Sequence, residues 1–448
     1  MNRNAAPAAE LPVTPFRDLW DWVIVSAIFT GIGILAYTAL RAPLFDHWAE
    51  MVRQGQWSAL FVRPTILWVS MGFVLLAFRT SLWLRYRPFP AATASEAPLL
   101  TVIIPAYNEG RMVEKSIDSV ARSDYPRGRL EIIAVDDGSR DDTWTYMERA
   151  ARRHPGLVAT VRFEKNRGKR AALAEGFRRA RGEVVVTIDS DSVIERGTLL
   201  AIAGPFRDPR VGAVAGKVSV YNRYEGLLPR MLHVRFTLSF DFLRSAQSTH
   251  GSVYCCPGAL AAYRLSVVRD VLERWEHQRF LGVPCTFGED RALTNFILAG
   301  GYDSVYQKTA VVHTMVPTTY AQLCKMYLRW DRSYVREELR FAGVVWKRPL
   351  VSRAIAFFDT TVTNLRFPVA YTSLGLFIVY SIQDPATVLR MLIGIGAVST
   401  FYMLYFLKSE RSWDFVYGVL YAYFSFLTLL WIFPYAALTV RARSWLTR

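Results

Sequence analysis

Cysteine is scarce in this chain of 448 residues, which has only Cys255, Cys256, Cys285 and Cys324. None of the four stands in a Cys-x-x-Cys pair or has a histidine at the spacing of a zinc site. The sequence therefore excludes a disulfide scaffold and a structural zinc site, and it indicates reduced thiols. We also expect no cleaved signal peptide, because the first residues lack a basic start followed by a short apolar core.

Acidic residues are also few compared with basic residues. The 38 Asp and Glu stand against 54 Lys and Arg, which gives a formal net charge of +16. Such an excess is typical of nucleic-acid binding, but no nucleic-acid motif is visible and we expect no nucleic-acid partner. We expect most of the excess positive charge to lie beside membrane segments, where it would contact anionic lipids. A basic pocket for a nucleoside diphosphate would account for a few more of the basic residues.

Long apolar runs are present and lie near both ends of the chain. Each is long enough to cross a bilayer: 22–40, 64–84, 367–383, 391–407 and 415–440. Arg79 interrupts the second run, and Arg85 and Arg87 follow it, so its exit faces the cytosol by the positive-inside rule. We therefore expect a multi-pass protein of a bacterial-type inner (plasma) membrane, with its polar middle in the cytosol.

These features divide the chain into predicted regions. They are a cytosolic tail (1–18), two transmembrane helices (19–88), a cytosolic polar domain (97–317) with an amphipathic interface helix (226–246), amphipathic interface helices (318–365), a transmembrane region (366–440) and a tail (441–448). Three final crossings would put the carboxyl terminus outside, yet Arg441, Arg443 and Arg448 favour the cytosol. We expect a cytosolic terminus, with 415–440 bent or re-entrant around Gly418 and Pro434.

The polar middle alternates strand-like and helix-like segments. Strands are expected at 100–105, 130–135, 158–163 and 184–188, with helices at 110–122, 141–153 and 169–181 between them. This alternation predicts parallel βαβ units in an α/β domain. In such open sheets the ligand binds beyond the carboxyl ends of the strands.

Polar clusters follow each of these strands. Tyr107 offers a flat face for a base, and Glu109 with Asp136 or Asp137 can accept hydrogen bonds from a base or ribose. Lys169 lies at the start of a helix, a good seat for a phosphate. Each cluster alone could be a surface aromatic or an ordinary turn. Four such polar clusters at one edge of a sheet favour a binding site for a nucleotide-sugar.

Asp189 and Asp191 follow the fourth strand directly. Residues i and i+2 of an extended segment share a face, so both carboxylates could point at one cation. A divalent metal held by one or two carboxylates keeps room for substrate phosphates. The pair therefore predicts a site for Mg²⁺ or Mn²⁺ with a diphosphate.

Two further acids, Glu289 and Asp290, precede a helix-like run at 292–299. Asp290 could simply cap that helix. The alternative is a general base that takes a proton from an acceptor hydroxyl while a metal stabilises the leaving diphosphate. Arg291 could help to keep such a base ionised.

Arg329 and Trp330 lie in a segment, 322–341, with aromatic and apolar residues at helical spacing among charges. This pattern predicts an amphipathic helix at the membrane surface. A second such stripe comprises Leu227, Met231, Val234, Leu238 and Phe242. Trp330 could be an interface anchor or a platform for an acceptor sugar.

In order along the chain, Pro-Ala-Tyr-Asn-Glu, Val-Asp-Asp-Gly-Ser, Asp-Ser-Asp-Ser, Gly-Glu-Asp and Arg-Trp resemble the processive membrane glycosyltransferases of family 2. The resemblance covers residues from about 98 to the end and is greatest to hyaluronan synthases and rhizobial chitooligosaccharide (N-acetylglucosaminyl) synthases. It implies a GT-A-like, Rossmann-like mixed sheet in a cytosolic domain inserted between transmembrane helices.

The resemblance also implies roles for single residues. Tyr107, Glu109, Asp137 and Lys169 would hold UDP, Asp189 and Asp191 would bind Mg²⁺ or Mn²⁺, and Asp290 would be the base. Arg329 would face the diphosphate and Trp330 the acceptor sugar, while Cys256 and Gly258 belong to the acceptor floor. The spans would form a channel for the growing chain.

Three positions depart from the family pattern. Met326 stands where the glutamine of Gln-x-x-Arg-Trp is usual, with Gln322 one turn earlier. Gly-Glu-Asp is nearer the chitooligosaccharide type than the Gly-Asp-Asp of hyaluronan synthases. Leu446 replaces the glycine of the terminal Trp-Gly-Thr-Arg.

The leading hypothesis is a processive inverting β-glycosyltransferase that polymerises UDP-sugars and secretes the polysaccharide. The donor would be UDP-N-acetylglucosamine, with or without UDP-glucuronic acid, so a chitooligosaccharide or poly-N-acetylglucosamine synthase is the alternative. A non-processive transferase that loads a lipid carrier and a non-catalytic export subunit are further hypotheses. The sequence assigns no oligomeric state.

Overall fold

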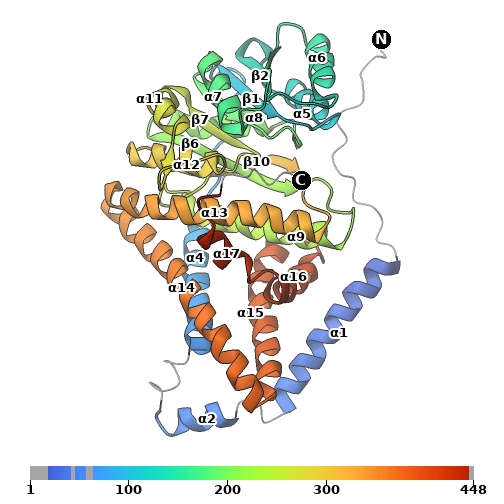
Figure 1. Cartoon of the computed structure of the whole chain (residues 1–448), viewed down its shortest axis with the longest axis vertical. Coiled ribbons are helices and arrows are strands. Elements are labelled where there is room, and N and C mark those ends of the chain that lie inside the picture. Colours follow the sequence, from blue (N-terminus) through green and yellow to red (C-terminus); the bar gives the residue numbers. More distant parts are fainter. Residues whose placement is uncertain (1–18, 42–45, 57–63, 443–448) are drawn as a thin grey trace.

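The computed structural model describes residues 19–41, 46–56 and 64–442. The predicted tail 1–18 and the terminal motif at 445–448 lie outside these ranges. Figure 1 shows an α/β domain above two nearly horizontal helices, α9 and α13, with long helices running away beneath them.

The centre of the α/β domain is an eight-stranded sheet in the order β3-β2-β1-β4-β7-β6-β10-β5. The strands are β1 (Leu100–Ala106), β2 (Leu130–Asp136), β3 (Val158–Arg162), β4 (Val184–Thr187), β5 (Ser192–Ile194), β6 (Val211–Val220), β7 (Ala261–Arg264) and β10 (Asp303–Thr314). A separate hairpin joins β8 (Arg279–Phe280) to β9 (Val283–Pro284).

The first four strands are parallel neighbours, as their sequence pattern predicts. β1 pairs with β2 and β4, and β2 pairs with β3, all in parallel register. β7 then runs antiparallel to both β4 and β6, and β5 is antiparallel to β10, so the sheet is mixed. The mixed sheet confirms the predicted fold class.

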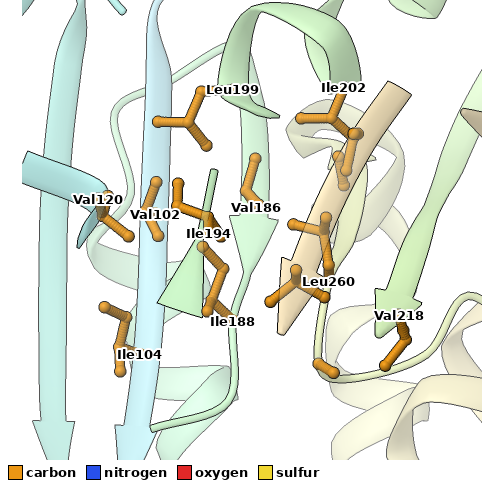
Figure 2. Close-up of a cluster of buried hydrophobic side chains, with 14 of the residues drawn as sticks. Val102, Ile104, Val120, Val186, Ile188, Ile194, Leu199, Ile202, Val218 and Leu260 are labelled. Carbon is orange, nitrogen blue, oxygen red and sulfur yellow. The ribbon is translucent and has the colours of Figure 1, made fainter. Parts of the chain in front are cut away.

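Alternate residues of the strands bury opposite faces of the sheet. Val102 and Ile104 pack with Val120 of α5 and Leu199 of α8 on one face, shown in Figure 2. Ile103 points to the other face, which α7, α11 and α12 cover. The helices of the domain are α5 (Met112–Ala121), α6 (Thr143–Arg153), α7 (Lys169–Arg179), α8 (Thr198–Ala203), α11 (Leu265–Glu276) and α12 (Glu289–Ala299), with short 3-10 turns at Arg127–Arg129 and Gly204–Arg207.

One layer of helices separates the sheet from the long apolar helices. It contains α9 (Leu227–Thr237), a π turn (Leu238–Phe242), α10 (Leu243–Ser248) and α13 (Tyr320–Val344). Within the predicted interface stripe, Met231 and Val234 pack on Phe406 and Tyr417 of the apolar helices. Phe236, from the same helix, packs into the sheet core. Helix α9 is therefore packed between the two parts, with Leu227 exposed at its start.

Three helices of the described ranges are long and apolar enough to cross a membrane: α4 (Pro64–Arg85), α14 (Leu350–Gln383) and α15 (Ala386–Glu410). Helices α16 (Phe415–Thr428) and α17 (Ile432–Leu438) form a fourth candidate that is bent by 52°, in the segment predicted to be bent or re-entrant. The first predicted run lies in α1 (Leu19–Arg41), where only Phe29–Thr38 counts as a shorter apolar helix. A short helix, α2 (Asp46–Arg53), follows it. These helices make the chain a membrane protein.

Helix α14 extends beyond the predicted start of the membrane region. It is continuous from Leu350 and passes through residue 366, where the sequence pattern placed a boundary. In the first half of α14, Asp359 accepts a hydrogen bond of 2.7 Å from Nε of Arg79 in α4. Because both charges are buried between helices, this ion pair fixes α14 against α4.

Candidate active site

The loops after β1 and β2 are joined at the carboxyl edge of the sheet. The backbone N–H of Asn108, a residue with φ of 53°, donates to Oγ of Ser139 at 3.0 Å. Oδ1 of Asn108 accepts from the N–H of Arg140 at 2.9 Å. Tyr107 and Glu109 flank this turn and are both half-buried. The structure thus places both beside the second cluster, as the sheet order requires.

Asp137 joins the loop after β2 to the loop after β3. Its carboxylate accepts the N–H groups of Arg167 at 2.7 Å and Gly168 at 2.9 Å. Burial raises the pKa of Asp137, although these two hydrogen bonds oppose the shift. Gly138 between the loops has φ of 73°, and a Cβ there would lie 2.6 Å from the backbone of Lys165. Only glycine fits this close approach.

Asp136 is fully buried beneath these loops. Its Oδ1 accepts the N–H of Ser139 at 3.0 Å, and Oδ2 lies 3.3 Å from Nε of Arg162. These contacts make Asp136 part of the floor that holds the turn. Binding of base or ribose by either aspartate stays a prediction.

A pocket opens where α7, β4 and α12 meet. Lys169 pairs with Oδ1 of Asp189, and its Nζ lies 3.3 Å from Oε1 of Glu289. The pocket is lined by Pro105, Lys169, Leu173, Phe177, Thr187, Asp189, Gly258, Tyr263, Trp275, Glu289, Asp290 and Leu293. Five of the predicted site residues thus share one pocket, although they come from four separate parts of the sequence.

Asp191 lies in a tight turn, which changes the geometry argued from the sequence. Strand β4 ends at Thr187, and the N–H of Ser192 donates to the carbonyl of Asp189 at 3.0 Å. The extended spacing that would put both carboxylates on one face is therefore absent between Asp189 and Asp191. Oδ1 of Asp191 accepts from the hydroxyls of Ser192 at 3.1 Å and Thr314 at 3.2 Å.

Asp290 does not cap helix α12. The N-cap is Gly288, with φ of 75°, and the helix begins at Glu289. Oδ1 of Asp290 accepts from the N–H of Arg291 at 2.7 Å. Its Oδ2 accepts from the N–H of Gly258 at 3.3 Å and from the thiol of Cys255 at 3.6 Å. Three donors therefore hold the carboxylate at the edge of the pocket.

The pKa values of the two adjacent acids of α12 are shifted in opposite directions. Burial raises the pKa of Asp290, and the neighbouring negative charge of Glu289 raises it further. Burial also disfavours the charged form of Glu289, but the Lys169 ammonium holds the pKa of Glu289 below its ordinary value. Glu289 therefore keeps its negative charge more readily than Asp290, whose carboxyl takes up a proton at a higher pH.

This difference leads to a prediction for Glu289→Gln. If ionised Asp290 is the base, activity is lost as pH falls through its pKa. Removing the charge of Glu289 lowers that pKa, so the acidic limb of the pH–rate profile should move to lower pH. UDP release measured from about pH 3.5 to about pH 8 checks this shift, because an unperturbed Asp has a pKa of about 3.9. Glu273→Gln, an exposed change on α11, is the control, and an unmoved acidic limb in Glu289→Gln would contradict the assignment.

Trp330 lies in an aromatic cluster at the surface of α13. Its ring centroid is 5.9 Å from that of Phe236, 6.3 Å from Phe240 and 5.7 Å from Tyr327. The side chain remains 36% exposed, so it keeps an accessible surface for stacking. Arg329 is close enough to Glu289 for its charge to help lower the pKa of that acid.

Gln322 does not replace the glutamine missing at Met326. Thr319 is the N-cap of α13, and Gln322 completes a capping box by accepting from the N–H of Thr319 at 3.3 Å. Met326 itself is buried in the sheet-side core. The side chain at this position therefore packs in the core instead of offering a polar group.

Cys256 and Gly258 lie in the segment before β7. The Cys256 thiol is fully buried, and its backbone N–H donates to Oγ1 of Thr294 at 3.0 Å. Gly258 faces the pocket, where an added Cβ would lie 3.0 Å from Nζ of Lys169. Cys256 thus lies in the buried core next to the pocket, and Gly258 forms part of the pocket wall.

Several residues at the site were not predicted from the sequence. Cys255 contacts Asp290, and Nε1 of Trp275 donates to the carbonyl of Glu289 at 2.9 Å. Burial raises the pKa of Asp331, next to Trp330, to about 7. Trp275 has the sequence pattern of an ordinary core residue of an amphipathic helix. The residues next to Cys255 and Asp331 in the sequence give no sign that these two lie at the site. Their contacts come from distant segments, which the sequence does not pair.

The mixed sheet and its edge pocket define a GT-A-like glycosyltransferase domain. The family model "Glycosyl transferase family 2" matches residues 101–272. The chain is 33% identical over 355 residues to an N-acetylglucosaminyltransferase of Azorhizobium caulinodans, covering 78% of this chain and 87% of that protein. It is also 33% identical over 289 residues to a hyaluronan synthase of Streptococcus pyogenes, covering 63% and 68%.

A solved structure shares the fold. It is a mannosyltransferase from Pyrobaculum calidifontis in complex with GDP-Man and Mn²⁺, with a TM-score of 0.56 and 24% identity, covering 81% of this chain and 99% of that chain. The chain belongs to glycosyltransferase family 2, together with rhizobial N-acetylglucosaminyltransferases and hyaluronan synthases. It is therefore a hexosyltransferase.

Proposed function

We propose that this enzyme is a processive, inverting β-glycosyltransferase that builds a polysaccharide from UDP-sugars and secretes it between its own membrane helices. The observation that carries this proposal is the position of Asp290. Its carboxylate lies in the same pocket as Lys169 and Asp189, and three donors orient it. The apolar helices beneath the domain supply the membrane part of the proposal.

In the proposed reaction, Asp290 takes the proton of an acceptor hydroxyl. That oxygen forms a bond to the anomeric carbon of the donor sugar as the bond from this carbon to UDP breaks. Attack opposite the leaving group inverts the anomeric centre, so an α-linked donor yields a β-linkage. Tyr107, Glu109, Asp137 and Lys169 would hold UDP, and Trp330 would stack on the acceptor sugar. Cys256 and Gly258 would form the acceptor floor, with Arg329 toward the diphosphate.

The site fits a divalent cation. Carboxylate oxygens are the donors that Mg²⁺ and Mn²⁺ take, and Asp189 presents one to the pocket. Asp189 would hold the cation, with Asp191 supporting it from the adjacent turn. When bound, the cation would neutralise the charge that develops on the leaving diphosphate. The Pyrobaculum mannosyltransferase was solved with Mn²⁺, which supports this assignment.

Two relatives that are equally identical to this chain support a proposal for the donor sugar. One is named an N-acetylglucosaminyltransferase and the other a hyaluronan synthase. We propose UDP-N-acetylglucosamine as a donor, with UDP-glucuronic acid as a second donor if the product is hyaluronan. The Gly-Glu-Asp motif favours the chitooligosaccharide type.

A product assay separates these two functions. Purified protein is incubated with UDP-N-acetylglucosamine, with and without UDP-glucuronic acid, and the product is digested with chitinase or hyaluronidase. A chitinase-sensitive polymer from the first donor alone identifies a chitooligosaccharide synthase. A hyaluronidase-sensitive polymer that requires both donors identifies a hyaluronan synthase. Transfer of a single sugar to a lipid would contradict the processive proposal.

We also propose the membrane orientation. The sheet domain would lie in the cytosol, where UDP-sugars are made, and α4, α14 and α15 would cross the plasma membrane. Arg85 and Arg87 at the cytosolic end of α4 support this orientation. The bent pair α16–α17 would return the chain toward the cytosol.

A further inference from the structure

Lys169 lines the pocket as a partly buried cation of the chain itself. It is the first residue of α7, and its ammonium pairs with Asp189 and lies 3.3 Å from Oε1 of Glu289. The backbone of Gly258 closes the third side, because a Cβ there would lie only 3.0 Å from Nζ. The ammonium is thus enclosed by two carboxylates and a glycine.

The charge of this lysine is well matched to its surroundings. Burial alone would disfavour the ammonium, but the carboxylates of Asp189 and Glu289 outweigh it and raise the pKa of Lys169 above its ordinary value. Glu289 is buried, and a buried carboxylate without a cation is costly, so Lys169 stabilises Glu289 while it also pairs with the partly exposed Asp189. Asp189, the proposed metal ligand, therefore already has a cationic partner from the chain itself.

We propose that Lys169 competes with the divalent cation for Asp189, so that the cation binds tightly only when a diphosphate is also present. This inference rests on the proposed function. An anionic diphosphate beside the start of α7 gives the ammonium an alternative partner. Once Lys169 pairs with the phosphate, the carboxylate of Asp189 can take the divalent cation. Nucleotide and metal then bind with positive coupling, and each strengthens the other.

Binding of Mn²⁺ followed by electron paramagnetic resonance tests this coupling without a turnover. The wild-type protein should bind Mn²⁺ alone weakly and should bind it on the order of tenfold more tightly with UDP. Lys169→Met should bind Mn²⁺ alone more tightly than the wild type, and UDP should add little. Lys169→Arg, which keeps the charge, should keep the wild-type weakness toward Mn²⁺ alone.

Lys165→Met is the matched control, because Lys165 is exposed in the loop before α7. It removes one nearby positive charge and should leave Mn²⁺ binding as in the wild type. Equal or weaker Mn²⁺ binding by folded Lys169→Met, or an equal gain in Lys165→Met, would overturn the inference. If Lys169→Met does not fold, the wild-type protein decides, because Mn²⁺ affinity that UDP does not change contradicts the competition. Tight UDP-dependent binding that survives in Asp189→Asn would instead overturn the metal role of Asp189 in the proposed function.

Discussion

Asp290→Asn is expected to abolish sugar transfer while UDP binding survives. The amide cannot accept the proton of the acceptor hydroxyl, and general base catalysis contributes on the order of 10²–10⁴-fold. The substitution keeps the shape of the side chain and leaves Lys169 and the loops that would hold UDP in place. UDP release from the donor measures the rate, and titration with UDP measures binding.

The control for this change is Asp270→Asn. Asp270 is exposed on α11, so the variant loses one carboxylate without touching the pocket. Its activity should equal that of the wild type. Full activity of Asp290→Asn would show that another group takes the proton, and loss of UDP binding would show that Asp290 supports the donor site instead.

Gly288→Ala should destabilise the region where α12 meets α13. The φ of 75° at Gly288 costs an L-residue about 1–2 kcal/mol. The new Cβ would also lie 2.7 Å from Cβ of Ser333 and 2.8 Å from Nη2 of Arg336. Overpacking of this kind costs about 1–3 kcal/mol, and it would displace Glu289 and Asp290 from the pocket. We expect a lower midpoint of thermal unfolding together with loss of most activity.

Gly301→Ala separates backbone strain from this collision. Gly301 has φ of 89°, but no atom lies near the position of its Cβ. The midpoint of thermal unfolding of this variant should fall only by the amount that backbone strain causes, and its activity should be unchanged. Equal effects of the two substitutions would contradict the claim that close packing of α12 on α13 positions Asp290.

The parallel part of the sheet could be predicted because its signals are local. The run Val184–Ile188 is apolar except for Thr187, which is typical of buried parallel strands, and β4 occupies Val184–Thr187. Strand β7 was not predicted, since Ala261–Arg264 is short and rich in alanine and its pairing with β4 and β6 is non-local. The sequence therefore predicts the first half of the sheet better than the second.

The candidate site shows the same division. The common location of Lys169, Asp189, Glu289 and Asp290 in one pocket could be predicted because several polar clusters follow strands that end at the same edge of a sheet. The turn at Asp191 could not, because a one-residue shift in the end of β4 changes which way its side chain points. The cluster around Trp330 depends on Phe236 of α9 and Phe240 of the π turn, which come near Trp330 only in the folded structure.

The membrane helices illustrate a third case. The apolar runs of the sequence predict most of α4 and α15. The third predicted run begins at Phe367, whereas helix α14 begins at Leu350. The added turns contain Asp359, whose charge argues against a membrane helix until its partner Arg79 is known. This ion pair could not be predicted from composition, because Arg79 and Asp359 are far apart in the sequence.

The most direct test of the account is the ratio of UDP released to sugar incorporated into long chains. Purified enzyme in lipid bilayers is given radiolabelled UDP-N-acetylglucosamine, with UDP-glucuronic acid in a parallel sample. The account predicts one UDP per sugar incorporated, products of many sugars from the earliest times, and neither signal from Asp290→Asn. UDP release that yields only free monosaccharide, or equal polymer from Asp290→Asn, would contradict it.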